Sequence, residues 1–209
     1  MKILNLYCGI GGNRKLWGDD HEITSVENNE DIACVYQAFF PKDKVIIGDA
    51  HEYLLKHFQE FDFIWSSPPC PSHSTFRKNF SVNVGAKVIY PDMKLYEEIL
   101  LLQGYFKGKY VVENVKSWYK PLVEPILLQR HYFWANFEIP NKEFEKDGIG
   151  LTGGRNQHEN KQIKKLQDKM GFDLTGLKGN KRTMLRNCVN PLVGKYILDK
   201  AINQVKTLF

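Results

Sequence analysis

Short apolar runs alternate with helix-like stretches along the first 115 residues of this chain. The helix-like stretches repeat apolar residues every three or four positions, as in 31–40, where Pro41 ends the pattern. This alternation is typical of α/β proteins that have a mostly parallel sheet with helices on both faces. The predicted strands are 2–7, 23–27, 44–47, the run that begins at Phe61, and 109–115; the predicted helices are 31–40 and 50–58.

The second half of the chain is less regular. Residues 72–91 are polar and show no period, which predicts a mobile loop, and long loops in compact domains are usually functional. A helix with one apolar face is predicted after Asp92, its N-cap. The predicted elements beyond it are an aromatic, strand-like segment at 127–137 and helices at 159–170 and 192–205.

The composition fits one domain with a small appendage. The 209 residues are 43% hydrophobic and 13% aromatic, which is enough for a full core. We expect a main domain at 1–140, a small polar segment at 141–181 and a segment at 182–209 that returns to the main domain. No stretch approaches 18 apolar residues, so a cytoplasmic protein without membrane contact is expected. A monomer is also expected.

Cysteine usage indicates a reducing compartment. The four cysteines, Cys8, Cys34, Cys70 and Cys188, lie far apart, and none forms a Cys-x-x-Cys pair. This spacing argues against a disulfide framework and against a zinc site, so no metal is expected.

Positive charge is concentrated in one segment. The whole chain has a net charge of +5, and residues 155–186 hold nine Lys or Arg against three Asp or Glu. A basic segment beside a nearly neutral domain indicates a polyanionic partner such as nucleic acid. A solvated, lysine-rich helix face is the alternative interpretation.

Cys70 is the strongest candidate for chemistry. The apolar run from Phe61 stops at Ser67-Pro68-Pro69-Cys70-Pro71, which predicts a buried strand that ends in a rigid loop. A loop at the carboxyl edge of an α/β sheet is where such proteins bind their ligands. A thiol needs a nearby cation or a helix amino terminus to become nucleophilic, and the flanking residues supply neither. A small buried thiol that closes a strand is the alternative.

Three motifs in order resemble the cytosine-carbon-5 DNA methyltransferases. They are Gly9-Ile10-Gly11-Gly12 after the first strand, Pro68-Pro69-Cys70 after the fourth and Glu113-Asn114-Val115 at the end of the fifth. The resemblance spans most of the chain and implies a Rossmann-like, adenosylmethionine-dependent methyltransferase fold. It departs at Asn5, where the family usually has aspartate, and at Arg186, where the family has glycine.

The resemblance implies S-adenosylmethionine as the cofactor. Glycines let the backbone turn tightly, so that a cofactor approaches the amino terminus of the helix that follows. Glu27, which ends the second strand, would accept hydrogen bonds from ribose hydroxyls; a glutamate that only caps the strand is the alternative. Asp49 would lie beside the adenine amine, or cap the next helix. The implied cofactor-binding residues are Tyr7, Cys8, Gly9, Gly11, Gly12, Glu27, Asn28, Asp49, Ala50, Pro68, Asn187 and Val189.

The resemblance also implies the catalytic residues. Cys70 would add to carbon 6 of cytosine while Glu113 protonates or hydrogen-bonds the ring. Asn114 would hold the strand end, and Arg130 would bind the base carbonyl or a phosphate. The family's Gln-x-Arg-x-Arg motif is incomplete after Gln129 and Arg130, so the role of its second arginine is either lost or taken by His131.

Duplex DNA is the implied partner, with the target base flipped out of the helix. Because the recognition segment is short, we expect a target of roughly two to four base pairs. The expected DNA-binding residues are Ser74, Arg77, Lys78, the base readers Arg155 and Asn156, and the phosphate contacts Lys161, Lys164 and Lys165. A bacterial or phage protein of restriction-modification type is the expected setting. The alternatives are an amino-methyltransferase, an RNA cytosine methyltransferase and an inactive nucleic-acid-binding relative.

Overall fold

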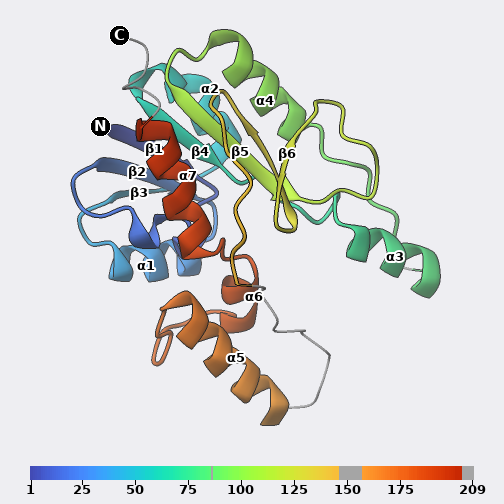
Figure 1. The fold of residues 1–209 in the computed structure, drawn as a ribbon. Coiled ribbons are helices and arrows are strands. Elements are labelled where there is room, and N and C mark those ends of the chain that lie inside the picture. Colours follow the sequence, from blue (N-terminus) through green and yellow to red (C-terminus); the bar gives the residue numbers. More distant parts are fainter. Residues whose placement is uncertain (86, 146–156, 204–209) are drawn as a thin grey trace.

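A mixed sheet forms the centre of the molecule. The computed structural model describes residues 1–85, 87–145 and 157–203. Within them, seven strands form one sheet in the order β3-β2-β1-β4-β5-β7-β6 (Figure 1). Strands β1 to β5 are parallel, and β7 runs antiparallel to both β5 and β6. The strands are β1 (Lys2–Leu6), β2 (Glu22–Glu27), β3 (Lys44–Ile47), β4 (Phe63–Ser66), β5 (Lys109–Val115), β6 (Ile126–Leu128) and β7 (His131–Ala135). The predicted mostly parallel α/β sheet is confirmed.

Helices cover both faces of the sheet, as predicted. One apolar cluster joins Ile3, Trp65 and Val111 of the strands to α7, and a second joins Leu4, Ile64 and neighbouring strand residues to α2 and α4. Side chains on successive strand positions therefore face opposite layers. The helices are α1 (Glu30–Phe39), α2 (Ala50–His57), α3 (Thr75–Val84), α4 (Lys94–Tyr105), α5 (Gln157–Met170), α6 (Lys181–Arg186) and α7 (Pro191–Asn203), with 3-10 turns η1 (Arg14–Leu16) and η2 (Phe58–Glu60).

The helix expected after the glycine turn is a single short turn. Only η1 follows Gly12, so this prediction is wrong in extent. Helix α7 packs against η1: a Cβ on Gly194 would collide with the backbone of Asn13, and the Trp17 indole donates to the Gly194 carbonyl at 3.1 Å. The C-terminal helix thus covers the sheet where a first helix was expected.

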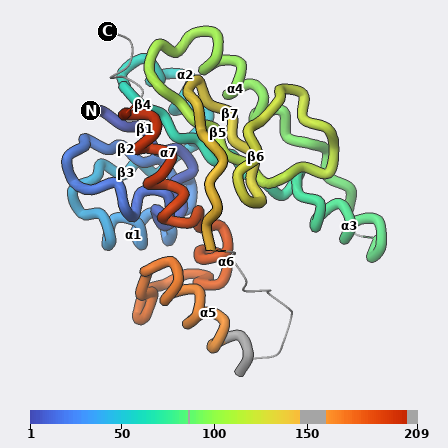
Figure 2. The backbone as a smooth tube through the Cα atoms, in the orientation of Figure 1, coloured from blue at the N-terminus to red at the C-terminus, as the bar shows by residue number. Residues whose placement is uncertain are grey.

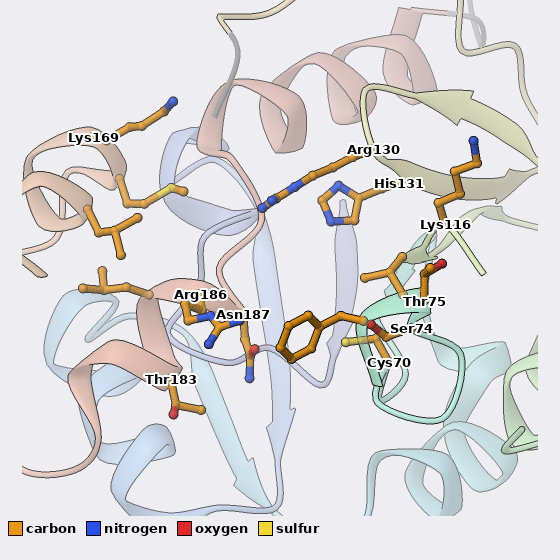
Figure 3. A pocket seen from close by; sticks show the side chains of 15 residues that line it. Cys70, Ser74, Thr75, Lys116, Arg130, His131, Lys169, Thr183, Arg186 and Asn187 are labelled. Atoms are coloured by element: carbon orange, nitrogen blue, oxygen red, sulfur yellow. The ribbon is translucent and has the colours of Figure 1, made fainter. Parts of the chain in front are cut away.

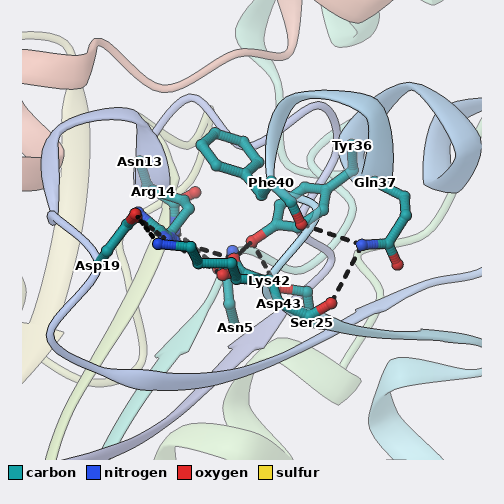
Figure 4. A network of polar contacts seen from close by, with 10 residues as sticks. All are labelled: Asn5, Asn13, Arg14, Asp19, Ser25, Tyr36, Gln37, Phe40, Lys42 and Asp43. Atoms are coloured by element: carbon teal, nitrogen blue, oxygen red, sulfur yellow. Dashed lines mark hydrogen bonds and ion pairs between the residues drawn. The ribbon is translucent and has the colours of Figure 1, made fainter.

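A buried ion pair joins η1 to the loop before β3. The Arg14 guanidinium donates to both carboxylate oxygens of Asp43, at 2.9 and 3.0 Å, and both side chains are almost fully buried (Figure 4). The Tyr36 hydroxyl also donates to Asp43, at 2.7 Å, and accepts from Ser25. The turn after β1 is therefore held by residues of α1 and of the loop before β3.

Two local predictions between residues 72 and 93 are corrected. Residues 72–91 contain α3, which has no buried residue and projects away from the sheet in Figure 1. A helix without a buried face has no apolar period, so its sequence looks like a loop. Helix α4 is capped at Met93 instead of Asp92, although the Asp92 carboxylate still accepts from the Lys94 amide at 3.1 Å.

The basic segment packs on the main domain. Leu166 and Met170 of α5 and Leu185 of α6 share an apolar cluster with Val35 and Tyr36 of α1. After α6 the backbone returns to the sheet as α7 (Figure 2). The boundaries at 140 and 181 stay a prediction. None of the helices in the described ranges is long and apolar enough to cross a membrane.

Candidate active site

The carboxyl ends of β1, β4 and β5 meet at one edge of the sheet. The strand order reverses between β1 and β4, and ligands in open α/β sheets bind at such a reversal. The glycine turn follows β1, the Pro-Pro-Cys loop follows β4, and Glu113 and Asn114 lie at the end of β5. Sequence segments far apart in the chain are thereby brought together.

The loop that carries Cys70 is tied down on two sides. The Asn114 side-chain amide donates to the Pro68 carbonyl at 2.9 Å. The amides of His73 and Ser74 donate to the Cys70 carbonyl at 3.0 and 3.1 Å. Proline at position 68 adds a fixed φ angle, so the loop has little freedom.

Cys70 faces a cavity of about 410 Å³. Figure 3 shows Cys70, Ser74 and Thr75 on one side of this cavity and Thr183, Arg186 and Lys169 on the other. Arg130 and His131 lie between the two sides. The cavity is lined by Cys70, Ser74, Thr75, Phe76, Val115, Lys116, Arg130, His131, Leu166, Lys169, Met170, Thr183, Leu185, Arg186 and Asn187. The predicted residues Cys70, Ser74, Arg130 and Asn187 therefore share one cavity.

The Cys70 thiol is half-buried between charges of both signs. Burial raises its pKa above the usual value, and the nearby Glu113 carboxylate raises it further. The positive charge of Arg186 acts in the opposite direction and lowers the pKa. Glu113 and Arg186 therefore act on the pKa of the Cys70 thiol in opposite directions.

Glu113 and His131 form a close pair. His131 Nε2 lies 3.7 Å from Glu113 Oε1, and the Glu113 side chain is largely buried. The chain reaches this position through a tight turn at Gln129, whose φ of 56° is positive, so that Arg130 and His131 both line the cavity. Whether His131 takes the role of the family's second arginine stays a prediction.

The glycine turn is bound to the end of β2. The Gly9 amide donates to Glu27 Oε2 at 3.1 Å, and the Asn29 amide donates to Glu27 Oε1 at 3.0 Å. A Cβ on Gly12 would collide with Cys188 and the Val189 backbone. A Cβ on Gly9 would meet no atom within 4 Å. Gly12 is therefore needed for packing, whereas Gly9 borders open space.

The other predicted cofactor residues differ in their surroundings. Asp49 caps α2, because its Oδ1 accepts from the His51 and Glu52 amides at 2.8 and 3.1 Å, which confirms the capping interpretation. Asn28 is exposed, and Pro68 and Ala50 are buried.

Glu98 is a buried acid that the sequence interpretation missed. Its side chain is fully buried in α4 and accepts from the Tyr7 hydroxyl at 2.6 Å and the Ser66 hydroxyl at 2.5 Å. His51 Nδ1 lies 3.1 Å from it. Glu98 follows Leu95 by three positions, so it shares the apolar face of α4, and an acid on such a face is the signal that could have revealed it.

The predicted DNA-binding residues are spread over two helices. Lys161, Lys164 and Lys165 are exposed on α5, while Leu166 and Met170 of the same helix face the core. Lys78 of α3 is exposed, and its amine lies 5.4 Å from the Trp118 ring centroid. Arg77 is partly exposed on the same helix. Arg155 and Asn156 lie outside the described residues. No cluster of His, Cys, Asp or Glu that could hold a metal ion occurs in the part of the chain that the structure describes.

Comparison with known proteins shows the family and the fold of the chain. The family model for the C-5 cytosine-specific DNA methylase matches residues 1–121. No curated protein sequence is significantly similar to the chain. The methyltransferase EhMeth of Entamoeba histolytica has a similar structure, with a TM-score of 0.57 and 12% identity over 98% of both chains. The Rossmann-like methyltransferase fold is thereby confirmed.

Two further solved structures have lower TM-scores. The Spodoptera frugiperda DNMT2 E260A/E261A/K263A mutant is 28% identical over 55% of this chain and 35% of its own, with a TM-score of 0.38. The chain therefore spans about a third of that relative. A putative DNA modification methyltransferase from an Escherichia coli prophage is 16% identical over 67% of this chain and 49% of its own, with a TM-score of 0.43.

Proposed function

Because this chain belongs to the C-5 cytosine-specific DNA methylase family, we propose that it methylates carbon 5 of cytosine in DNA through a transient bond from Cys70 to the base. The observation that carries this proposal is the cavity that Cys70 shares with Arg130, beside the Glu113 carboxylate. Its volume of about 410 Å³ lies within the range of small-ligand sites. A flipped nucleotide would enter it with the face of the base toward the thiol.

The residues beside the glycine turn fit S-adenosylmethionine. Gly9 has a positive φ of 54° and borders open space, so a ligand can approach the backbone there. Glu27 offers a carboxylate at the end of β2, where an acid binds ribose hydroxyls in nucleotide-binding folds. When bound, the cofactor supplies the electrophilic methyl group. The proposed binding residues are Tyr7, Cys8, Gly9, Gly11, Gly12, Glu27, Asn28, Asp49, Ala50, Pro68, Asn187 and Val189.

Cys70 makes carbon 5 of cytosine nucleophilic. Its thiolate adds to carbon 6, which forms the Sγ–C6 bond and moves the π electron pair of the C5=C6 double bond toward carbon 5 and the ring nitrogen, while the σ bond of the ring stays. Glu113 hydrogen-bonds or protonates that nitrogen, and Arg130 binds the base carbonyl or a phosphate. After methylation, water or a nearby base removes the carbon 5 proton, the Sγ–C6 bond breaks and the thiolate leaves.

Asn114 positions the nucleophile. Its bond to the Pro68 carbonyl joins the strand that carries Glu113 to the loop that carries Cys70. The acid and the thiol therefore keep a fixed separation while the base is bound, as catalysis by orientation requires.

Basic side chains of α3 and α5 are proposed to hold the DNA. Lys161, Lys164 and Lys165 are exposed along one helix, and Lys78 is exposed on the helix that begins just after the Cys70 loop. Such side chains bind phosphates and give affinity without sequence information. Ser74 and Arg77 are proposed to act with them, and Arg155 and Asn156 as base readers.

The direct test is methyl transfer from labelled S-adenosylmethionine to duplex DNA, followed by nucleoside analysis. We expect 5-methylcytosine from the wild type and none from Cys70→Ala, while Cys34→Ala, which removes an exposed thiol of α1, keeps the activity. Duplex DNA that contains 5-fluorocytosine should trap a covalent complex, because fluorine blocks the last elimination. A methylated exocyclic amine, or product in RNA alone, would overturn the proposal.

A further inference from the structure

The Cys70 loop does not supply the positive charge that a nucleophilic thiol needs. The amides of His73 and Ser74 are used by the Cys70 carbonyl, and α3 begins only at Thr75. Burial and the Glu113 carboxylate both raise the pKa of the thiol, so they favour its protonated form. A compensating cation has to come from another part of the chain.

Helix α6 supplies such a cation from a position more than a hundred residues later in the chain. Arg186 is the last residue of α6 and lines the same cavity as Cys70 (Figure 3). Where the family pattern has glycine, this chain places a guanidinium, which stays charged at every physiological pH. Because the departure falls at the cavity wall, it changes the electrostatics of the site.

The backbone on both sides of Arg186 is anchored. Met184 and Leu185 are buried in the apolar cluster that α6 shares with α1. On the other side, Gly12 packs so closely on Cys188 and Val189 that a Cβ would not fit. These contacts hold the end of α6 beside the glycine turn. The guanidinium is therefore presented from a fixed backbone position, although its side chain is exposed.

Several charged or titratable groups face the cavity around Cys70. Lys116, Arg130 and His131 come from β5, β7 and their connections, Lys169 from α5 and Arg186 from α6, with the Glu113 carboxylate close by. Of these groups, Arg186 lies across the cavity from Cys70 in Figure 3, and its positive charge lowers the pKa of the Cys70 thiol.

We propose that Arg186 stabilises the Cys70 thiolate across the cavity and so replaces the missing positive charge of the Pro-Pro-Cys loop. The Sγ–H proton leaves to water, and the negative charge on sulfur faces the guanidinium. Arg186 is a positioning residue that acts through Cys70. The role of Arg186 in catalysis rests on the proposed function, but the protonation state of the Cys70 thiol can be measured without cofactor or DNA.

The test is the pH dependence of Cys70 alkylation by iodoacetamide, followed by mass spectrometry of the Cys70 peptide. A Cys34→Ser background removes the exposed cysteine. Arg186→Met removes the charge, and Arg186→Lys keeps it. Lys181→Met removes a charge from the other end of α6, outside the cavity lining, and is the matched control.

We expect Arg186→Met to move the alkylation midpoint to higher pH and to slow the reaction at pH 7.5 on the order of three- to tenfold. The plateau rate at high pH should not change, because it reports access of the reagent to the thiol. Arg186→Lys and Lys181→Met should keep profiles close to the wild type. Circular dichroism checks that each variant is folded.

Two results would overturn the inference. One is an unchanged midpoint in Arg186→Met, even if the plateau changes; the other is an equal shift in Lys181→Met. If Arg186→Met does not fold, Arg186→Lys decides the question. A folded Arg186→Lys variant whose alkylation midpoint lies at clearly higher pH than that of the wild type would overturn the inference as well. A protein that shows the Arg186-dependent profile but does not methylate cytosine would contradict the proposed function and leave this inference standing.

Discussion

The side-chain amide of Asn114 donates a hydrogen bond of 2.9 Å to the main-chain carbonyl of Pro68. The same side chain accepts from the Val115 amide at 2.9 Å, so both ends of the Asn114 amide are engaged. Asn114 is buried, so its polar atoms have to be paired within the protein. The bond therefore fixes the position of Cys70 relative to the end of β5.

Asn114→Ala should lower kcat for methylation strongly and the free energy of unfolding only moderately. The loop loses its link to β5, so Cys70 takes up several positions, and misplacement by about 1 Å costs on the order of 100-fold in rate. The cost in unfolding free energy should be about 1 to 3 kcal/mol, because the Pro68 carbonyl is left without a partner. Single-turnover methylation and urea unfolding measure the two effects.

Asn136→Ala is the matched control. Asn136 also donates to a main-chain carbonyl, that of Gly108 at 2.8 Å, but at the opposite end of β5. It should lose stability and keep kcat. An equal loss of kcat in the two variants would show that the Asn114 effect is a general loosening of the sheet.

The Arg14–Asp43 pair should contribute strongly to stability. Removal of one partner leaves a buried charge without compensation, which typically costs about 3 to 5 kcal/mol. Arg14→Met should therefore lower the unfolding free energy by an amount of this order, measured by urea denaturation. Lys42→Met, which breaks the exposed 2.8 Å pair with Asp19, should change stability little. Similar losses in both variants would contradict the assignment.

His51 should stabilise the fold most at mildly acidic pH. Its hydrogen bond to the buried Glu98 raises the pKa of the imidazole, and burial only partly opposes this. Because the folded-state pKa lies above the unfolded value, the stabilisation is fully present below the unfolded pKa, near 6.5, and is lost as pH rises through the folded pKa.

The measurement is the difference in unfolding free energy between wild type and His51→Gln from pH 5.5 to pH 9. The difference should be largest at the acidic end and shrink as pH rises. A difference for His51→Gln that grows toward pH 9 would refute the charged pair.

Local sequence patterns predicted the strands well because strand formation here depends on short apolar runs and their breakers. Strands 44–47 and 109–115 have the predicted bounds. The helix expected after Gly12 failed for a long-range reason: α7 fills the space, and Arg14 finds its partner 29 residues away in Asp43. Helix α3 was missed because it buries no side chain and so shows no period.

The features of the site also fall into those that the sequence predicts and those that only the folded chain shows. The motifs around Cys70 and Glu113 could be recognised because each lies at a strand end that the sequence marks. The motif at Asn187 was recognised too, but nothing in the sequence shows that it shares a cavity with Cys70. The partners of Glu98 come from three other elements, and such contacts become visible only when the chain is folded.

Glu27→Ala should weaken binding of S-adenosylmethionine. The variant loses the proposed ribose contacts and also the acceptor that holds the Gly9 amide at 3.1 Å, so the loss should be about 1 to 3 kcal/mol. Calorimetry with the free cofactor measures it. Glu22→Ala, at the exposed start of the same strand, is the control and should bind normally. Equal affinities for Glu27→Ala and wild type would remove Glu27 from the site.

His131 should perform the role of the second arginine in the family motif. Its Nε2 lies 3.7 Å from Glu113 Oε1, and its ring lines the cavity that holds Cys70. From this position it can orient the Glu113 carboxylate and donate to the carbonyl of the base. A hydrogen bond to a charged group contributes about 1.5 to 3 kcal/mol, which corresponds to roughly 10- to 100-fold in rate.

His131→Ala should therefore slow both methylation and formation of the 5-fluorocytosine adduct by a factor of this order, with cofactor affinity unchanged. His131→Arg should retain most of the rate, because a guanidinium donates from the same wall of the cavity. His57→Ala, which is outside the cavity lining, controls for the loss of a histidine. If His131→Ala formed the adduct at the wild-type rate, the second arginine's role would have been lost from this chain, and Arg130 alone would have to hold the base.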